Sequence, residues 1–285
     1  MEYSTFAVLS VKVVKDAMWG LIIAPNLVES QNIVNFAIVK RNLGKVIFTI
    51  IDFKTVYKRK MKYIIFDFDG TIGDSQSLIV KTLQDTMRVR HLEVKSDEEC
   101  AKTIGLRLDE AFVSLFDMSD EEGMECAATY REIFLENKQT MIVKPFPHVI
   151  ETLRELHHRG FVLGMASSRN HCSLDGYVKQ MQLEDIFSSI VAGDDVEHVK
   201  PAPDMVFKAL GEMKGIENPV TSSDDVKDML EETLVVGDMN FDVDMAHHAG
   251  CRACAVTYGN GTREQLASAE WIIDDFAELQ EILKG

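Results

Sequence analysis

The sequence is poor in cysteine, tryptophan and proline, and it has no long apolar run. Its 285 residues include five cysteines, two tryptophans and six prolines. So few cysteines, in an odd number, cannot form a dense disulfide framework, so we expect reduced thiols and a cytoplasmic protein. The most apolar run, Met18–Val28, contains Gly20, Pro25 and Asn26. It is well short of the roughly 20 apolar residues of a membrane helix, so we expect no membrane partner.

Basic residues are outnumbered by acidic ones. The chain has 30 Lys and Arg against 46 Asp and Glu, a net charge of −16, and 46% hydrophobic residues, enough for a folded core. Residues 1–60 hold nine basic and four acidic residues, whereas residues 61–285 hold 21 and 42. A surface this acidic repels a phosphate backbone, so we expect no nucleic acid partner. Any phosphate that the protein handles needs a cation.

Residues 1–60 and residues 61–285 also differ in their hydrophobic pattern. Residues 1–60 show no repeated helix or strand pattern closed by caps, and they end in three basic residues before Met61. An apolar strand-like run follows at once, as at the start of many compact α/β proteins. We expect residues 1–60 to be an extension outside the catalytic fold, translated from sequence upstream of a start at Met61. The other interpretation is a small accessory domain.

From Met61 onward, short apolar runs alternate with amphipathic stretches, a pattern typical of a parallel sheet covered by helices on both faces. The predicted strands are Tyr63–Phe66, Val162–Ala166, Ser189–Ala192, Leu234–Val236, Ala253–Val256 and Trp271–Ile273. Residues 77–144 carry helical spacing instead and end before Pro145. We therefore predict an α/β fold with a Rossmann-like, doubly wound parallel sheet formed by residues 61–76 and 145–285. The helical insert of residues 77–144 is predicted to form a cap.

The first predicted strand is followed directly by Asp67-Phe68-Asp69-Gly70-Thr71. Ligand sites of open α/β sheets form at such strand ends, and alternate residues of an extended chain point the same way. Asp67 and Asp69 can therefore converge on one group, one as a nucleophile and the other as a general acid and base. Gly70 permits close approach to a phosphate, and Thr71 can fix the loop. The alternative is an acidic turn after a strand, which the Gly-Thr that follows makes less favoured.

A second acidic pair, Asp238 and Asp242, follows the apolar run Leu234–Val236 and Gly237. Mg²⁺ prefers oxygen ligands, and one or two carboxylates with a substrate phosphate oxygen suffice to bind it. Asp242 lies one helical turn beyond Asp238 and is expected to face the same site. The alternative for Asp238 is a helix N-cap, a role compatible with metal binding.

Two further candidates follow predicted strands. The hydroxyls and backbone N–H groups of Ser167, Ser168 and Arg169 can hold phosphoryl oxygens, although the serines alone are ordinary helix caps. Lys200 lies beside Pro201, and its ammonium can offset charge on a phosphoryl group and on the carboxylates, although a single lysine is usually solvated. The order of all four signals, each after a predicted strand, favours a joint site.

These motifs match, in order, those of the haloacid dehalogenase-like hydrolase superfamily, which the segment from Met61 to Gly285 resembles. The helical insert is similar to the cap of the phosphoglycolate phosphatase and β-phosphoglucomutase branch. The resemblance implies that Asp67 is the nucleophile, Asp69 the general acid and base, Ser167 a phosphoryl hydrogen-bond donor and Lys200 the charge stabiliser. It also implies Mg²⁺ bound by Asp67, the backbone carbonyl of Asp69 and Asp238, with support from Asp242.

The resemblance implies a Mg²⁺-dependent phosphatase that hydrolyses a small phosphorylated metabolite, phosphoglycolate-like or a sugar phosphate, through an aspartyl-phosphate. We expect a monomer or homodimer. A phosphomutase and a non-enzymatic phospholigand-binding module are the alternatives; dehalogenation is disfavoured because family dehalogenases lack an equivalent of Asp69. Two departures weaken transfer of substrate identity: Ser168-Arg169 replaces a frequent Asn-Lys, and His148 replaces a common Gly.

Three other features are interpreted as structural. Cys251 and Cys254 have redox or zinc spacing but lack a second ligand pair, and Cys254 is expected to be a core residue. The adjacent pairs His157-His158 and His247-His248 point in different directions on predicted helices, which disfavours chelation. The segment Gly215–Glu232 is expected to be a surface loop.

Overall fold

The computed structural model describes the backbone of the strands at residues 20–22, 35–42 and 45–52, and residues 60–216, 220 and 222–284. The chain divides into two units, Met1–Arg59 and Lys60–Gly285. In the first unit, β1 (Gly20–Ile22), β2 (Asn35–Asn42) and β3 (Lys45–Asp52) form an antiparallel sheet in the order β1-β2-β3. The sequence pattern did not predict these strands. That the unit lies outside the catalytic fold stays a prediction.

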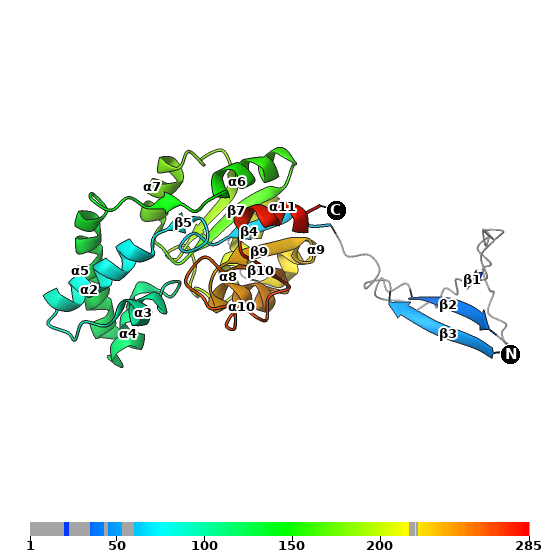
Figure 1. Cartoon of the computed structure of the whole chain (residues 1–285), viewed down its shortest axis with the longest axis horizontal. Helices are drawn as coiled ribbons and strands as arrows, with labels where there is room; N and C mark the ends of the chain where they lie inside the picture. The colour runs from blue at the N-terminus through cyan, green and yellow to red at the C-terminus, as the bar shows by residue number, and fades with distance from the viewer. Residues whose placement is uncertain are drawn as a thin grey trace. The chain divides into compact units, whose positions relative to one another are not determined.

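The second unit is built on a six-stranded parallel sheet with the strand order β11-β10-β9-β4-β7-β8 (Figure 1). Its strands are β4 (Tyr63–Phe66), β7 (Val162–Ser167), β8 (Phe187–Ala192), β9 (Thr233–Gly237), β10 (Arg252–Val256) and β11 (Trp271–Ile273). All six coincide with predicted strands, and some extend one or two residues further. The predicted α/β fold with a parallel sheet is therefore confirmed.

Helices cover both faces of this sheet because its strands are apolar on both sides. In β4, Ile64 and Phe66 pack into one core, and Ile65 packs into the other. The first core includes α6 (Val149–His158), α7 (His171–Gln180) and the short C-terminal elements η2 (Phe276–Glu278) and α11 (Leu279–Ile282). The second includes α8 (Asp204–Lys214) and α10 (Asn240–Ala249).

The helical insert leaves the sheet unit through a short two-stranded ribbon. β5 (Gly73–Asp74) pairs antiparallel with β6 (Lys144–Pro145). Between them lie four helices, grouped together at one side of the sheet in Figure 1: α2 (Gln76–Val89), α3 (Asp97–Ala101), α4 (Leu108–Phe116) and α5 (Asp120–Asn137). Serine capping boxes at Ser96 and Ser119 start α3 and α5. The predicted helical cap is confirmed.

The prediction of a surface loop at Gly215–Glu232 is wrong for much of the segment. The 3₁₀ helix η1 (Ser223–Val226) continues into the short helix α9 (Lys227–Leu230). Val226, Met229 and Leu230 are buried in the same core as α8. Their spacing of three and four residues places them on one helical face, and the polar run around them conceals this pattern.

His148, which stands where a glycine is common in the family, takes a backbone conformation that glycine favours. It is the N-cap of α6 and has a φ of 61°. Its Nδ1 lies 2.7 Å from Asp275 Oδ2, at the start of η2. The predicted core position of Cys254 is confirmed, since the residue is buried in β10. No helix in residues 60–216 or 222–284 is both long and apolar enough to cross a membrane.

Candidate active site

The predicted site residues follow neighbouring parallel strands. β4 is hydrogen-bonded to β9 on one side and to β7 on the other. Asp67 continues this pairing by one residue, because its backbone N–H donates to the carbonyl of Val236 over 2.8 Å. Asp67, Asp238 and Ser167 therefore lie along the same carboxyl edge of the sheet, where open α/β sheets bind ligands.

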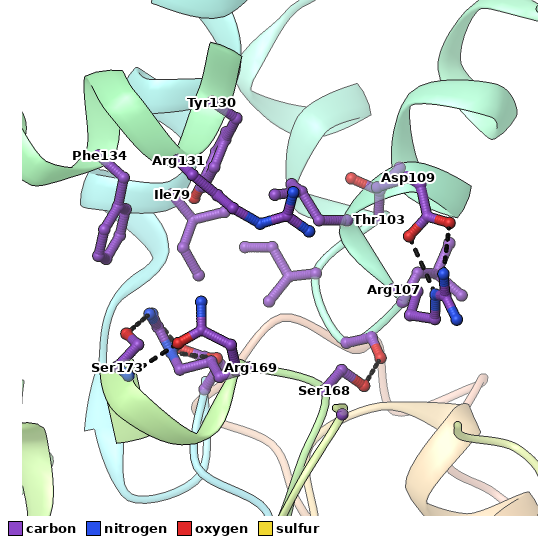
Figure 2. Close-up of a pocket in the computed structure, with 18 of the residues that line it drawn as sticks. Ile79, Thr103, Arg107, Asp109, Tyr130, Arg131, Phe134, Ser168, Arg169 and Ser173 are labelled. Carbon is purple, nitrogen blue, oxygen red and sulfur yellow. Dashed lines mark hydrogen bonds and ion pairs between the residues drawn. The ribbon is translucent and has the colours of Figure 1, made fainter. Parts of the chain in front are cut away.

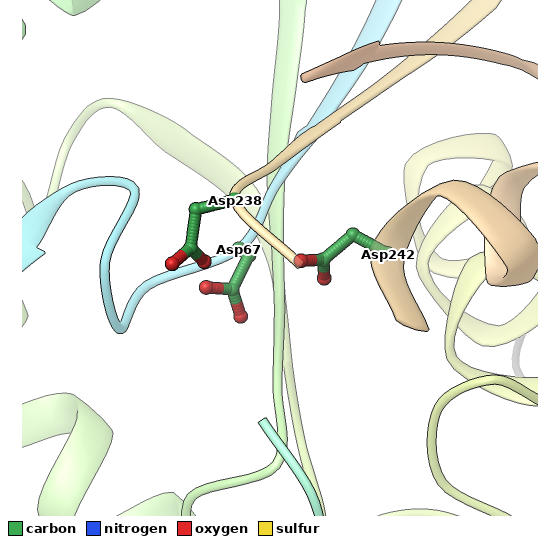
Figure 3. Close-up of side chains that lie close together, drawn as sticks. All are labelled: Asp67, Asp238 and Asp242. Atoms are coloured by element: carbon green, nitrogen blue, oxygen red, sulfur yellow. The ribbon is translucent and has the colours of Figure 1, made fainter. Parts of the chain in front are cut away.

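Three aspartates from two segments converge at this edge. Asp67, Asp238 and Asp242 each offer a carboxylate oxygen, and these oxygens lie within 4.8 Å of one another (Figure 3). The three residues are 5%, 0% and 3% exposed. Asp238 follows β9 directly, and Asp242 lies in the first turn of α10. Like charges buried this closely are costly, so the cluster requires positive charge nearby.

Lys200 supplies one positive charge. Its ammonium donates to Oδ1 of Asp67 and, over 2.7 Å, to Oδ1 of Asp242, and the residue is 2% exposed. Burial alone would lower the pKa of Lys200, but the carboxylates of Asp242 and Asp67 outweigh it and raise that pKa above its usual value. Burial raises the pKa of Asp67 well above its usual value, and Lys200 opposes this shift. Lys200 is therefore charged, and it is shared between two carboxylates.

Asp238 is fixed by a loop that follows β10. Its Oδ2 accepts hydrogen bonds from the backbone N–H of Asn260 at 2.6 Å and from the Asn260 side-chain amide at 2.8 Å. The Thr71 hydroxyl lies 3.4 Å from Oδ1 of Asp238. Burial raises the pKa of Asp238 to about 7; the charge of Asp242 adds to this rise, and the hydrogen bonds from Asn260 oppose it.

Gly70 allows the first loop to lie against Asp238. A Cβ atom on Gly70 would stand 2.1 Å from Oδ2 of Asp238, and the residue has a φ of 85°. Only glycine combines this left-handed backbone with so close an approach. Gly70 and Thr71 both lie against Asp238 in this structure, and their binding of phosphate stays a prediction.

The cluster fits a hard divalent cation. Both oxygens of Asp242 have donors, Lys200 for Oδ1 and the backbone N–H of Met239 for Oδ2 at 3.0 Å. In contrast, Oδ2 of Asp67 accepts no hydrogen bond from the described residues, and Oδ1 of Asp238 has only the long contact with Thr71. Asn260 Oδ1 is also buried without a partner among these residues. Carboxylate and amide oxygen atoms that are buried and lack hydrogen-bond donors are the kind of ligand that Mg²⁺ prefers.

Asp69 is not part of the cluster of three aspartates and is paired with Arg169. Arg169 Nε lies 2.9 and 2.7 Å from the two carboxylate oxygens, and Nη2 lies 2.7 Å from Oδ1. The hydroxyl of Ser75, at the start of α2, also donates to Asp69. The guanidinium lies within 6 Å of the ring centroids of Phe68, Phe134 and Tyr177, at 5.7, 5.3 and 4.9 Å. Arg169, predicted to bind phosphate, is thus neutralised by Asp69 in this structure.

The two serines after β7 have different surroundings. Ser167 is the last residue of β7, is 1% exposed, and its hydroxyl oxygen accepts from the backbone N–H of Arg169 at 3.3 Å. Ser168 donates its hydroxyl to the backbone carbonyl of Gly105, in the insert, over 2.6 Å. Ser167 therefore remains beside Asp67 at the sheet edge, whereas Ser168 joins the sheet unit to the cap.

A cavity of about 680 Å³ lies between the cap and this edge (Figure 2). Asp67, Asp69, Ser168 and Arg169 line it from the sheet unit. The cap side includes a mainly apolar set contributed by three helices and the loop before α4: Ile79, Leu83, Ile104, Leu106, Leu108, Ala111, Tyr130, Phe134 and Leu135. Asp67, the candidate nucleophile, therefore lines a cavity whose volume falls within the roughly 300–1,000 Å³ of typical sites for small organic ligands.

Sequence reasoning missed Asn260, Ser75 and the cap residues of the cavity. Asn260 lies in Tyr258-Gly259-Asn260-Gly261, directly after β10 at the same sheet edge. This glycine-rich turn was a usable signal, because the strand before it was predicted. Ser75 and the cap residues gave no such signal, since their contacts depend on how the insert folds back over the sheet.

Comparison with known proteins agrees with this geometry. A family model described as haloacid dehalogenase-like hydrolase matches residues 64–256. Pyrophosphatase PpaX of Anoxybacillus flavithermus is 29% identical over 222 residues, which cover 77% of this chain and 95% of that protein. Probable phosphatase IndB of Dickeya dadantii is 31% identical over 223 residues, which cover 76% of this chain and 90% of that protein.

Solved structures share the fold. A predicted phosphoglycolate phosphatase from Haemophilus somnus superimposes with a TM-score of 0.67 at 24% identity, covering 79% of this chain and 99% of that one. CbbY from Rhodobacter sphaeroides, solved in complex with phosphate, gives a TM-score of 0.63 at 20% identity, covering 77% of this chain and 96% of that one. The described cap and sheet unit is therefore of a known architecture.

Proposed function

The chain belongs to the haloacid dehalogenase-like hydrolase family, and we propose that it is a Mg²⁺-dependent phosphatase that acts through an aspartyl-phosphate. The observation that carries this proposal is the buried cluster of Asp67, Asp238 and Asp242, in which Lys200 pairs with Asp67 and Asp242 and Asp67 lines a cavity. The protein is a phosphatase of this family, in agreement with relatives that are named as a pyrophosphatase and a probable phosphatase.

Asp67 is the nucleophile. One of its carboxylate oxygens attacks the substrate phosphorus while the bond from phosphorus to the leaving oxygen breaks, which gives an aspartyl-phosphate and an alcohol. Lys200 orients the carboxylate through Oδ1 and leaves Oδ2 without a donor among the described residues. The ammonium also offsets the negative charge brought by the phosphoryl group, and Ser167, at the end of the neighbouring strand β7, donates a hydrogen bond to a phosphoryl oxygen.

Asp69 is the general acid and base. It gives a proton to the leaving oxygen in the first step and takes one from the water that attacks the aspartyl-phosphate in the second. In the present arrangement, its carboxylate is the partner of Arg169 and Ser75. Proton donation therefore requires the Asp69 carboxyl to leave Arg169 and turn toward the leaving group, a rearrangement that substrate binding has to drive.

Mg²⁺ would be held by Asp67, the backbone carbonyl of Asp69 and Asp238, with Asp242 supporting through Lys200. The bound ion would neutralise charge on the phosphoryl oxygens and orient them. Asn260 fixes Asp238 through two hydrogen bonds, which prepares one of these ligands in advance.

The substrate is a small phosphorylated metabolite, phosphoglycolate-like or a sugar phosphate, selected by the cap. Pyrophosphate is a further candidate because PpaX relatives are named pyrophosphatases. The acidity of residues 61–285 supports a small-molecule substrate over a nucleic acid. We also propose that the protein is cytoplasmic and that it is a monomer or a homodimer.

Phosphate release from p-nitrophenyl phosphate and from a panel of phosphate esters, phosphoglycolate and pyrophosphate tests this function. We expect turnover with Mg²⁺, loss of turnover with EDTA, and loss in Asp67→Asn. Asp224→Asn is a matched control, because this aspartate is exposed in η1. Rapid acid quenching with ³²P-labelled substrate should leave a hydroxylamine-sensitive label on the wild-type protein. Turnover by Asp67→Asn at the wild-type rate would exclude the mechanism.

A further inference from the structure

The charged residues of the cavity divide into paired and unpaired groups. Four cationic side chains line it: Arg107, Arg131, Lys138 and Arg169. Arg169 is neutralised by Asp69, and Arg107 is paired with Asp109 through contacts of 3.0 and 2.8 Å. Among the described residues, the exposed side chains of Arg131 and Lys138 make no hydrogen bond or ion pair, although the charge of Arg131 contributes, after the hydrogen bond from Arg107, to lowering the pKa of Asp109.

Arg131 and Lys138 belong to the same helix and the same face of it. Arg131 lies within α5 and Lys138 is the C-cap of that helix, seven positions further along the chain. Seven residues are about two helical turns, so the two side chains project from one face, with Phe134 between them. Figure 2 shows Arg131 extending from this helix across the cavity toward Thr103, opposite Arg169 and Ser168.

The cavity lining between Asp67 and the two α5 cations is mainly apolar. Ile79 and Leu83 of α2 and Tyr130 and Phe134 of α5 line it, and Leu83 and Phe134 are 1% and 7% exposed. A ligand held at Asp67 by its phosphoryl group would cross this surface before it meets Arg131 and Lys138. An inorganic anion alone would leave most of the apolar surface without contact.

We propose that Arg131 and Lys138 form a second anionic subsite, so that the preferred substrate is an organic phosphate ester with an apolar body and a distal carboxylate or phosphate. The proposal rests on the phosphatase function proposed above and specifies the substrate class of that site. Arg131 is the principal residue, because a guanidinium binds a carboxylate or phosphate through two parallel hydrogen bonds. Lys138 adds a point charge at the C-cap of the same helix.

A series of phosphorylated ω-hydroxy acids from glycolate to hydroxyhexanoate, each paired with its neutral amide, tests the subsite. Charge-assisted hydrogen bonds contribute about 1.5–3 kcal/mol, roughly a 10- to 150-fold change in affinity. For at least one chain length, we expect wild-type kcat/KM to favour the acid over its amide about tenfold or more. Arg131→Met should bring this ratio close to one, and Lys138→Met should reduce it.

Arg88→Met is the control, because Arg88 is an exposed cation on α2 that pairs with Asp85 and does not line the cavity. It removes the same charge from the cap and should leave the ratio unchanged. Calorimetric affinities of the same pairs, measured in the Asp67→Asn background, give the ratio without turnover. A preference for the acid lost only in Arg131→Met and Lys138→Met supports the subsite.

Failure of this proposal is distinguishable from failure of the phosphatase function. If the esters are hydrolysed but no acid is preferred over its amide, the subsite is refuted and the function stands. A preference that survives Arg131→Met and Lys138→Met also refutes it. If no ester is hydrolysed but the calorimetric preference is present and depends on Arg131, the subsite stands and the proposed function fails.

Discussion

Replacement of Lys200 by methionine is the most direct test of the charge balance in the site. Methionine keeps most of the length of the lysine side chain and removes its charge. Lys200 is 2% exposed and contacts Asp67 and Asp242, which are themselves 5% and 3% exposed. Without the ammonium, both carboxylates stay in the protein interior with no countercharge from it.

The expected loss of stability follows from this burial. Removing one partner of a buried ion pair destabilises proteins by about 3–5 kcal/mol, because the remaining charge is left uncompensated. For a unit of this size, about 2–4 °C of melting temperature corresponds to each kcal/mol, so Tm should fall by about 6–20 °C. The loss should be smaller at pH 5.5 than at pH 8, since buried carboxylates without Lys200 protonate at acid pH and so shed their charge.

Urea denaturation in EDTA at both pH values measures this loss. Asp242→Asn in the Lys200→Met background gives a double-mutant cycle, and the second substitution should recover about 0.5–3 kcal/mol of the free energy of unfolding. An unfolding free energy of Lys200→Met within about 0.5 kcal/mol of wild type at pH 8 would refute the reasoning. A loss equally large at both pH values would show that repacking, rather than charge, is the cause.

Three further predictions concern Asp238 and its neighbours. The pKa of Asp238 is about 7 in the folded state against the usual 3.8, so between about pH 4 and pH 7 the folded protein holds a proton that the unfolded chain has lost. The contribution of this group to the stability of the metal-free protein is therefore lost as the pH rises from about 4 to 7. Asp238→Asn should flatten this pH dependence of the unfolding free energy in denaturation titrations with EDTA. Gly70→Ala should lower the free energy of unfolding by about 1–3 kcal/mol more than Gly160→Ala, because Gly160 has the same φ of 85° but open space around it. Equal melting temperatures of the two variants would contradict the clash with Asp238. Asn260→Ala should reduce Mg²⁺ affinity or kcat/KM about 10- to 100-fold by freeing Asp238, as measured in Mg²⁺ titrations of activity; wild-type values for both would show that the amide does not orient this ligand.

The sheet and its acidic edge could be predicted because both follow from local pattern. Parallel strands buried on both faces are continuous apolar runs, and their carboxyl ends meet at one edge, so Asp67, Ser167 and Asp238 were placed together from spacing alone. The same reasoning could have included Asn260, after β10. The segment Gly215–Glu232 was misjudged because a short helix with three buried residues lies inside a polar run.

The pairings of individual side chains could not be predicted, since they depend on tertiary position. Arg169 is expected to bind phosphate, and its pairing with Asp69 in the structure could not be predicted from the sequence. Ser168 was given the same role and donates to Gly105, in a cap whose docking the sequence does not specify. Both residues line the cavity, and their binding of phosphate stays a prediction.

The pairings that the sequence left open determine the charge of the site. Four carboxylates, Asp67, Asp69, Asp238 and Asp242, meet two cations, Lys200 and Arg169, along one sheet edge. Two negative formal charges remain, and a single divalent cation balances them. Since the protein cations at this edge are already committed to carboxylates, positive charge for a second anionic group of the substrate has to come from elsewhere. On the cavity wall that the structure describes, the cations without an ion pair are Arg131 in α5 and Lys138 at its C-cap, so we expect the cap to discriminate between substrates while the core holds the phosphoryl group.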